Sequence, residues 1–200
     1  MKLLVIRHGQ TEYNVKGLVQ GQKDIPLNAN GRDQARTLAN QLQPYHIVKI
    51  FASPLVRAKA TAEIIQDVLG LYRKVPFIVD PALMERDFKP FEGKALKDLS
   101  ENELAFLRHL DETEIEGVEP LPEFTSRVLG FFERIRHVEA PGLQLDDCVL
   151  VVTHMGVLRL VFSSILNVSV KNRSSNCMVN EIIVDQDEFR LVENDEDVSW

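Results

Sequence analysis

Two kinds of hydrophobic pattern alternate along the chain. Several short runs are almost wholly apolar, which is typical of strands that are covered on both faces of a sheet. Other stretches repeat apolar residues at helical spacing, which is typical of helices that bury one face. The expected strands are Lys2–Ile6, Val48–Ala52, Val75–Val79 and Cys148–Val152.

The helical pattern is clearest in four stretches. Pro54 is expected to open one helix, with Ser53 as its N-cap, because proline suits the first helical position. The expected helices are Asn30–Leu42, Pro54–Leu69, Leu121–Val138 and Met155–Leu166. Near the end of the chain, Val179–Val184 and Phe189–Val192 flank Asp185–Glu188, which indicates a hairpin at the edge of the sheet.

Alternation of strands and helices predicts an α/β fold. We expect a three-layer sandwich with a central, mostly parallel sheet, helices on both faces and an antiparallel edge strand or hairpin. The chain shows no internal repeat, low-complexity tract or linker, so residues 1–200 are expected to form a single domain. The acidic segment Glu193–Asp197 is expected to be a solvated, frayed end.

Composition narrows the possible functions. Apolar residues make up 44% of the chain and charged residues 26%, as in ordinary globular proteins. No apolar run approaches the roughly 18 residues of a membrane helix, and no signal peptide is evident, so we expect a cytoplasmic protein without a membrane partner. The net charge of −7 argues against non-specific nucleic-acid binding but allows a locally cationic pocket for an anion.

Three expected strands end in residues suited to bind anions. Arg7-His8-Gly9 follows the first strand, Ser53 to Arg57 follows the second, and Thr153-His154-Met155-Gly156 follows the last wholly apolar one. Ligands of open α/β sheets bind at the carboxyl ends of the strands, and helix N-termini there favour anions. If these strands are parallel neighbours, two arginines and two histidines converge on one phosphate site.

The residues around these strand ends resemble the histidine phosphatase superfamily, the phosphoglycerate-mutase-like proteins. The resemblance covers residues 1 to about 165, with the motifs in the expected order. The matching segments are Leu4–Asn14, Gln20–Gly21, Asp24–Asn28, Gly31–Ala35, Ser53–Ala58 with Thr61–Ala62, Leu83–Arg86 with Phe91–Gly93, and Val152–Val157.

The resemblance implies a metal-independent phosphoryl transfer without any cofactor. His8 matches the nucleophile, and a backbone acceptor near Gly9 is expected to hold its other ring nitrogen. We also expect Gly9 to adopt the unusual backbone angles of a tight turn. Glu85 matches the proton donor to the leaving alkoxide, the alternative being a surface glutamate paired with Arg86. The groups that match contacts to the phosphoryl oxygens are Arg7, Arg57, His154 and the side-chain amide of Asn14.

Some positions stay open or depart from the family pattern. Gln20 and Gly21 align with a substrate-contacting loop, or are ordinary loop residues. Met155 stands where many relatives have glycine and is expected to narrow the pocket or add an apolar wall. Lys89 also replaces a common glycine and is expected to point to solvent, the alternative being an added positive charge near the site. Residues expected at the surface or in structural roles are His46, His109, His137 and Arg159.

Three functions compete. The first is a phosphomonoesterase acting on a small phosphorylated metabolite through phosphohistidine, and the second is a cofactor-primed phosphoglycerate mutase. The third is a catalytically silent module that binds phosphorylated ligands. Residues 94–120 are expected to form a lid that sets specificity, and they are fewer than in the mutases, which favours the phosphatase. The sequence is compatible with a monomer or a homodimer.

Overall fold

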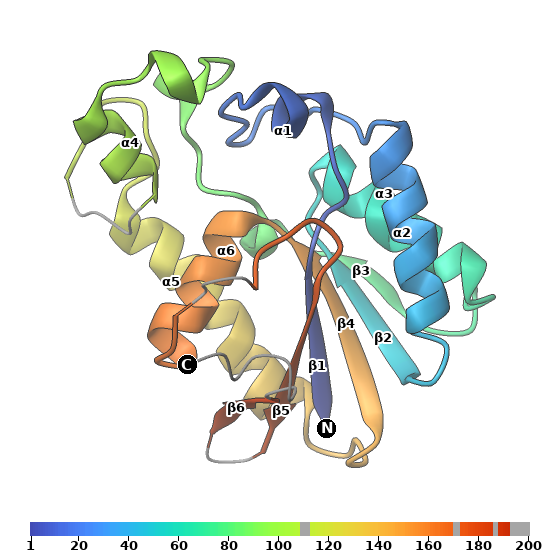
Figure 1. The fold of residues 1–200 in the computed structure, drawn as a ribbon. Helices are drawn as coiled ribbons and strands as arrows, with labels where there is room; N and C mark the ends of the chain where they lie inside the picture. Colours follow the sequence, from blue (N-terminus) through green and yellow to red (C-terminus); the bar gives the residue numbers. More distant parts are fainter. Residues whose placement is uncertain (109–112, 170–172, 186–187, 193–200) are drawn as a thin grey trace, which may run out of the picture.

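The computed structural model describes residues 1–108, 113–169, 173–185 and 188–192, arranged as in Figure 1. A six-stranded sheet lies at the centre, with strand order β3-β2-β4-β1-β5-β6. The strands are β1 (Lys2–Arg7), β2 (His46–Ala52), β3 (Phe77–Val79), β4 (Asp147–Thr153), β5 (Val179–Val184) and β6 (Phe189–Leu191). The helices are α1 (Glu12–Lys16), α2 (Ala29–Gln41), α3 (Val56–Val68), α4 (Glu101–Arg108), α5 (Leu121–Arg134) and α6 (Met155–Leu160).

The sheet has the mixed topology that the sequence predicts. Strands β1, β4, β2 and β3 pair in parallel, in that spatial order. Strand β5 runs antiparallel to β1, and β6 runs antiparallel to β5. Each predicted strand is confirmed to within two residues of its expected ends. Because β2, β4 and β1 are parallel neighbours, their carboxyl ends lie at the same edge of the sheet.

Helices cover both faces of the sheet and make three layers. Figure 1 shows α2 and α3 on one face and α5 and α6 on the other. Leu4 and Ile6 of β1 pack in the core on the α2 and α3 side. Leu3 and Val5 pack in the core on the α5 and α6 side. Strands buried on both faces need apolar residues at successive positions, which explains the continuous runs in the sequence.

The start of α3 corrects one prediction. The helix begins at Val56 with Leu55 as its cap residue and without a side-chain capping bond, so Pro54 does not open it and Ser53 is not its N-cap. The amide of Ser53 donates to Val152 O at 3.0 Å, which continues the pairing with β4 past the end of β2. The Ser53 side chain forms a hydrogen bond with His154 instead.

Other elements extend the predictions or carry no clear pattern. The two later predicted helices end in π-helical turns at Ile135–Glu139 and Val161–Ile165. The short helices α1 and α4 and the 3₁₀ turns between β3 and α4 lack a long apolar stripe, and the sequence did not predict them. None of the helices in the described ranges has both the length and the apolar character needed to cross a membrane. The predicted acidic tail and His109 lie outside the described residues.

A small third core lies beyond the carboxyl ends of the strands, near α1 and α4 (Figure 1). It joins the loop after α1 to the segment that leads from β3 to α5. Its buried members are Val19, Phe91, Leu99, Phe106 and Val118. Backbone hydrogen bonds between residues 17–19 and 93–96 fix the two segments to each other. Much of the predicted lid, 94–120, therefore packs on a core of its own.

Candidate active site

The two histidines meet where β1 and β4 end. Arg7 pairs with Thr153 in the parallel register, so His8 and His154 follow their strands at the same level. Their ring centroids lie 5.2 Å apart. Arg57, in the first turn of α3, places its Nε 3.3 Å from Nε2 of His8. The predicted convergence of these strand ends is therefore present in the structure.

The ring of His8 is fixed in one orientation. Its Nδ1 lies 2.7 Å from Gly9 O, and because a carbonyl only accepts, Nδ1 carries the hydrogen. Nε2 then holds the free lone pair, which accepts from Arg57. Burial lowers the pKa of His8 well below its usual value, and the charges of Arg57 and Arg7 lower it further. His8 is therefore a neutral imidazole, and the acceptor that the sequence predicted is Gly9 O.

Gly9 is required for a different reason than the sequence suggested. Its φ is not positive, so the turn does not need unusual backbone angles. A Cβ at Gly9 would lie 2.5 Å from the carbonyl oxygen of Gly31, and a Cβ at Gly31 would lie 2.1 Å from Gln10 O. The two glycines let the loop after β1 and the start of α2 touch through their backbones.

Arg57 is bound at both ends of its guanidinium. Nη1 donates to Lys23 O at 2.8 Å and Nη2 donates to Gly21 O at 2.7 Å. Burial lowers its pKa to about 10, against the opposing charges of Glu85 and Asp24. The side chain thus stays positive at neutral pH. Its fork holds the loop after α1, and its Nε is the group that faces His8.

Two buried side-chain nitrogens of the site lack partners. Arg7 donates from Nη1 to Ser174 O at 2.9 Å, but its buried Nε has no hydrogen-bond partner among the described residues. His154 forms a 2.8 Å hydrogen bond with Ser53 Oγ through Nε2, and its Nδ1 is likewise unpartnered. Buried polar atoms in native proteins are nearly always paired, so these two indicate a site for a polar ligand.

The electrostatics of this site favour an anion. Burial lowers the pKa of His154 well below its usual value, and the charges of Arg57, His8 and Arg7 add to that effect. The histidines are therefore neutral while both arginines are positive. An anion placed among them would lower the cost of burying both guanidinium charges.

Glu85 reaches the site from the segment after β3. Both of its carboxylate oxygens lie 3.1 Å from the amide of Gly156, in the first turn of α6. A Cβ at Gly156 would lie 2.1 Å from Glu85 Oε1, so only glycine allows this contact. The side chain of Arg86 donates from Nε to Glu119 O at 2.8 Å rather than to Glu85. The position of Glu85 beside the histidine helix fits a role at the site better than a surface ion pair.

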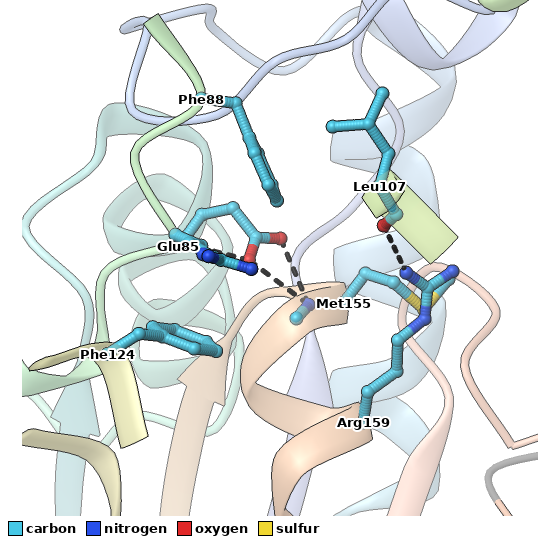
Figure 2. A pocket seen from close by; sticks show the side chains of 8 residues that line it. Glu85, Phe88, Leu107, Phe124, Met155 and Arg159 are labelled. Atoms are coloured by element: carbon cyan, nitrogen blue, oxygen red, sulfur yellow. Dashed lines mark hydrogen bonds between the residues drawn. The ribbon is translucent and has the colours of Figure 1, made fainter. Parts of the chain in front are cut away.

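A cavity of about 50 Å³ lies beside Glu85, and Figure 2 shows the side chains that line it. Its walls are mainly apolar, with two arginines among them. The residues that line it are Glu85, Arg86, Phe88, Leu107, Phe124, Met155, Gly156 and Arg159. Met155 forms part of the wall, as predicted. Arg159, expected to be structural, lines the cavity and also donates to Leu107 O at 3.0 Å.

Asn14, Gln20 and Gly21 make contacts within the loops of the protein. Asn14 Oδ1 accepts from the amide and hydroxyl of Thr11, both at 3.1 Å, and so caps α1. Gln20 Oε1 accepts from the same hydroxyl at 2.9 Å, and Gly21 supplies its carbonyl to Arg57. Lys89 points to solvent as predicted, with a side chain that is 73% exposed, and it pairs with Asp87.

Three residues that support the site were assigned no role from the sequence. Thr61 Oγ1 accepts from the amide of Gly9 at 3.0 Å and donates to Arg57 O at 2.7 Å. Asn176 donates from Nδ2 to His8 O at 2.7 Å. Arg127 bonds to the backbone around Glu85. Thr61 lies one helical turn after Arg57, so the spacing could have indicated it, whereas no pattern marks the other two.

Comparison with known proteins shows which family the chain resembles. The model of the histidine phosphatase superfamily (branch 1) matches residues 3–197. "Uncharacterized phosphatase PhoE" of Bacillus subtilis is 32% identical over 161 residues, which is 80% of this chain and 75% of that protein. "Probable phosphoglycerate mutase GpmB" of Enterobacter sp. (strain 638) is 31% identical over 188 residues, 91% of this chain and 84% of that one. The crystal structure of TTHB049 from Thermus thermophilus matches with a TM-score of 0.71 and 30% identity, covering 96% of this chain and 97% of that one.

Proposed function

The chain belongs to the histidine phosphatase superfamily, and on that premise we propose that it hydrolyses small phosphate monoesters through a phosphohistidine on His8. The observation that carries this proposal is the pair of unpartnered buried nitrogens, Arg7 Nε and His154 Nδ1, beside a neutral His8. Phosphoryl oxygens would accept from Arg7 Nε and, when the Ser53 hydroxyl donates to His154 Nε2, from His154 Nδ1. The lone pair on His8 Nε2 supplies the nucleophile.

In the first step, His8 Nε2 attacks phosphorus and the bond from phosphorus to the alcohol oxygen breaks. The leaving oxygen takes a proton from the carboxyl group of Glu85, so the alcohol departs neutral. Arg7, Arg57 and His154 stabilise the charge spread over the other phosphoryl oxygens. The two arginines supply the positive charge that a metal ion supplies in other phosphoryl-transfer enzymes, and neutral His154 adds a hydrogen bond.

In the second step, water attacks the phosphohistidine. The Glu85 carboxylate takes a proton from the water, the bond from phosphorus to Nε2 breaks, and inorganic phosphate leaves. His8 is then neutral again, because Nδ1 has kept its hydrogen on Gly9 O throughout. The substrate in this proposal is a small phosphorylated molecule in the cytoplasm. The enzyme that binds it is a monomer or a homodimer.

Turnover of p-nitrophenyl phosphate in excess chelator tests the proposal. We expect hydrolysis by the natural chain and an acid-labile phosphate on His8 in rapidly quenched samples. The His8→Ala variant should lose both, with kcat reduced on the order of 10⁴-fold or more, because no other nucleophile can replace the imidazole. No turnover and no labelled histidine in the natural chain would instead favour the silent binding module.

A mutase is the second candidate, and the cavity beside Glu85 gives a specific reason to test it. Arg86 and Arg159 line this cavity and suit a substrate that carries a second anionic group, as phosphoglycerate does. Its apolar walls, Phe88, Phe124 and Met155, suit an uncharged leaving group better. Supplying 3-phosphoglycerate with 2,3-bisphosphoglycerate separates the two. We expect release of phosphate, whereas rapid formation of 2-phosphoglycerate without phosphate release would identify a mutase.

A further inference from the structure

We propose that Arg127, locked by Glu119, is a positioning residue that holds Glu85 in place to protonate the leaving group. The inference rests on the proposed function, because it concerns the residue that acts as acid in that reaction. Arg127 lies on α5 and contacts the segment that carries Glu85 through its backbone. It therefore acts through Glu85 and does not itself need to touch the substrate.

Every N–H of the Arg127 guanidinium has a partner. Nη1 donates to Ala82 O at 2.9 Å and to Met84 O at 2.7 Å, and Nη2 donates to Glu85 O at 3.0 Å. Nε and Nη2 donate to the two carboxylate oxygens of Glu119 at 2.7 and 2.9 Å. Guanidinium has five N–H donors in a rigid fork, so these bonds fix its position fully.

The segment around Glu85 depends on these bonds. After the 3₁₀ turn at Pro81–Leu83, residues 84–88 belong to no helix or strand. Carbonyl groups in such a segment lack the partners that regular structure supplies, and buried ones must find them elsewhere. Arg127 supplies them at two positions of this segment, Met84 and Glu85, and it also donates to Ala82 O in the preceding 3₁₀ turn. Glu119 also accepts from the amide of Asp87 at 3.1 Å, so the ion pair holds this segment on both sides of Glu85.

The two ends of Glu85 are thus held by different helices. Its carboxylate faces the amide of Gly156 on α6, while its carbonyl accepts from Arg127 on α5 at 3.0 Å. Nε2 of Gln22 also donates to this carbonyl, at 3.0 Å. Gln22 holds this one carbonyl, whereas Arg127 also holds two preceding ones, so removing Arg127 would let the carboxylate drift from the leaving oxygen. A misplacement of about 1 Å in such a group reduces catalysis by about 10²-fold.

Arg134 provides a matched control on the same helix. Each arginine stacks on the phenylalanine three residues before it, at 4.8 Å for Arg127 on Phe124 and 5.2 Å for Arg134 on Phe131. Each also pairs with a carboxylate, which for Arg134 is Asp80. Arg134→Met therefore removes an ion pair and a stacked cation without touching the carbonyl groups near Glu85.

The test compares substrates whose leaving groups differ in their need for an acid. The p-nitrophenolate ion leaves readily without a proton, whereas a simple alkoxide must be protonated as it leaves. The quantity to measure is kcat/KM, since it reports on the steps up to formation of phosphohistidine. Arg127→Met should lower kcat/KM for an alkyl phosphate by about 10²-fold and for p-nitrophenyl phosphate by less than about fivefold. Arg134→Met should leave both within about twofold.

Glu85→Gln completes the test, because it removes the acid itself. If Arg127 acts through Glu85, the double variant should lose no more selectivity between the two substrates than Glu85→Gln alone. If thermal unfolding shows that Arg127→Met does not fold, Arg127→Lys and Glu119→Gln are measured in its place. Both should lower kcat/KM more for the alkyl phosphate than for p-nitrophenyl phosphate, by a smaller factor than expected for Arg127→Met. An equal loss for both substrates, or additive losses in the double variant, would overturn the inference. A natural chain without turnover or phosphohistidine would instead refute the proposed function itself.

Discussion

Arg57 combines two tasks in one side chain. Its Nε faces the nucleophilic nitrogen of His8, while its fork holds the loop that contains Gly21 and Lys23. Asn14, by contrast, accepts from the amide of Thr11 through its side-chain oxygen Oδ1 and so caps α1. The two residues therefore differ both in charge and in how much of the site depends on them.

We expect Arg57→Ala to reduce kcat/KM for p-nitrophenyl phosphate more than Asn14→Ala does. Hydrogen bonds to charged groups are worth about twice those between neutral groups, so we expect losses on the order of 10²-fold and about tenfold or less. Steady-state kinetics on the two variants measure this order. Circular dichroism should show that both variants remain folded. The reverse order would mean that Arg57 is not a clamp for the phosphoryl group.

Gly156 tests the placement of Glu85 from the other side. A Cβ there would lie 2.1 Å from the end of the flexible Glu85 side chain, so the carboxylate can move aside at little cost to the fold. We expect Gly156→Ala to change the free energy of unfolding by less than about 1 kcal/mol and to lower kcat/KM for an alkyl phosphate at least about tenfold. Urea denaturation and steady-state kinetics measure the two quantities. A large loss of stability with unchanged kinetics would contradict this account of the contact.

At the scale of elements, two glycines in helices have opposite significance. Gly31 lies in the first turn of α2 against the backbone of Gln10, whereas Gly130 lies exposed on α5 with nothing within 4 Å of its would-be Cβ. Gly31→Ala should lower the free energy of unfolding by about 1–3 kcal/mol, because backbone must move away from backbone. Gly130→Ala should raise it by about 0.5–1 kcal/mol through helix propensity. Urea unfolding of both variants checks the signs, and destabilisation by Gly130→Ala would contradict the open space around that position.

The elements that the sequence predicted are those whose stability comes from burial along their whole length. β1 and β4 are apolar on both faces, and the apolar stripe of α5 is long, so the pattern alone identifies them. The start of α3 was misassigned because Ser53-Pro54 has the local preference of a helix start. Tertiary contacts decide otherwise, since the amide of Ser53 bonds to Val152 and its hydroxyl to His154.

The site likewise contains residues that the sequence indicated and residues that it did not. His8 and Arg57 stand in motifs that follow strands, so both the spacing and the family resemblance pointed to them. Arg127 and Asn176 bond to backbone carbonyl groups of residues 42 or more positions away in the chain. A side chain that binds backbone places no demand on the type of the residue that it contacts. Sequence patterns therefore carry little trace of such supports.

At the scale of the whole molecule, an acidic protein contains a cationic site. The net charge is −7, yet buried Arg57, partly buried Arg7 and two buried histidines meet at the carboxyl edge of the sheet. Residues of β1 and β4 pack in the two large cores on either side of the sheet, and His8 and His154 directly follow those strands. The stability of the whole fold is therefore coupled to the protonation of the site.

This coupling predicts how stability depends on pH. The pKa values of His8 and His154 are both lowered well below the usual value, chiefly by burial. Below pH 6.5, which is about the pKa of an unfolded histidine, the unfolded chain binds protons that the folded protein does not. The free energy of unfolding should therefore fall with decreasing pH, by up to about 1.4 kcal/mol per pH unit for each histidine, until the folded-state pKa values are reached.

Urea denaturation between pH 7.5 and 5 in phosphate-free buffer measures this dependence. The double variant His8→Gln, His154→Gln serves as the control, because it retains the carboxylates that also destabilise proteins in acid. We expect the natural chain to lose stability more steeply than the control below pH 6.5, and each single variant to lie between them. Equal slopes would mean that the two histidines do not stay neutral in the folded protein. In that case the unprotonated Nε2 on which the proposed attack depends would not be the resting state of His8.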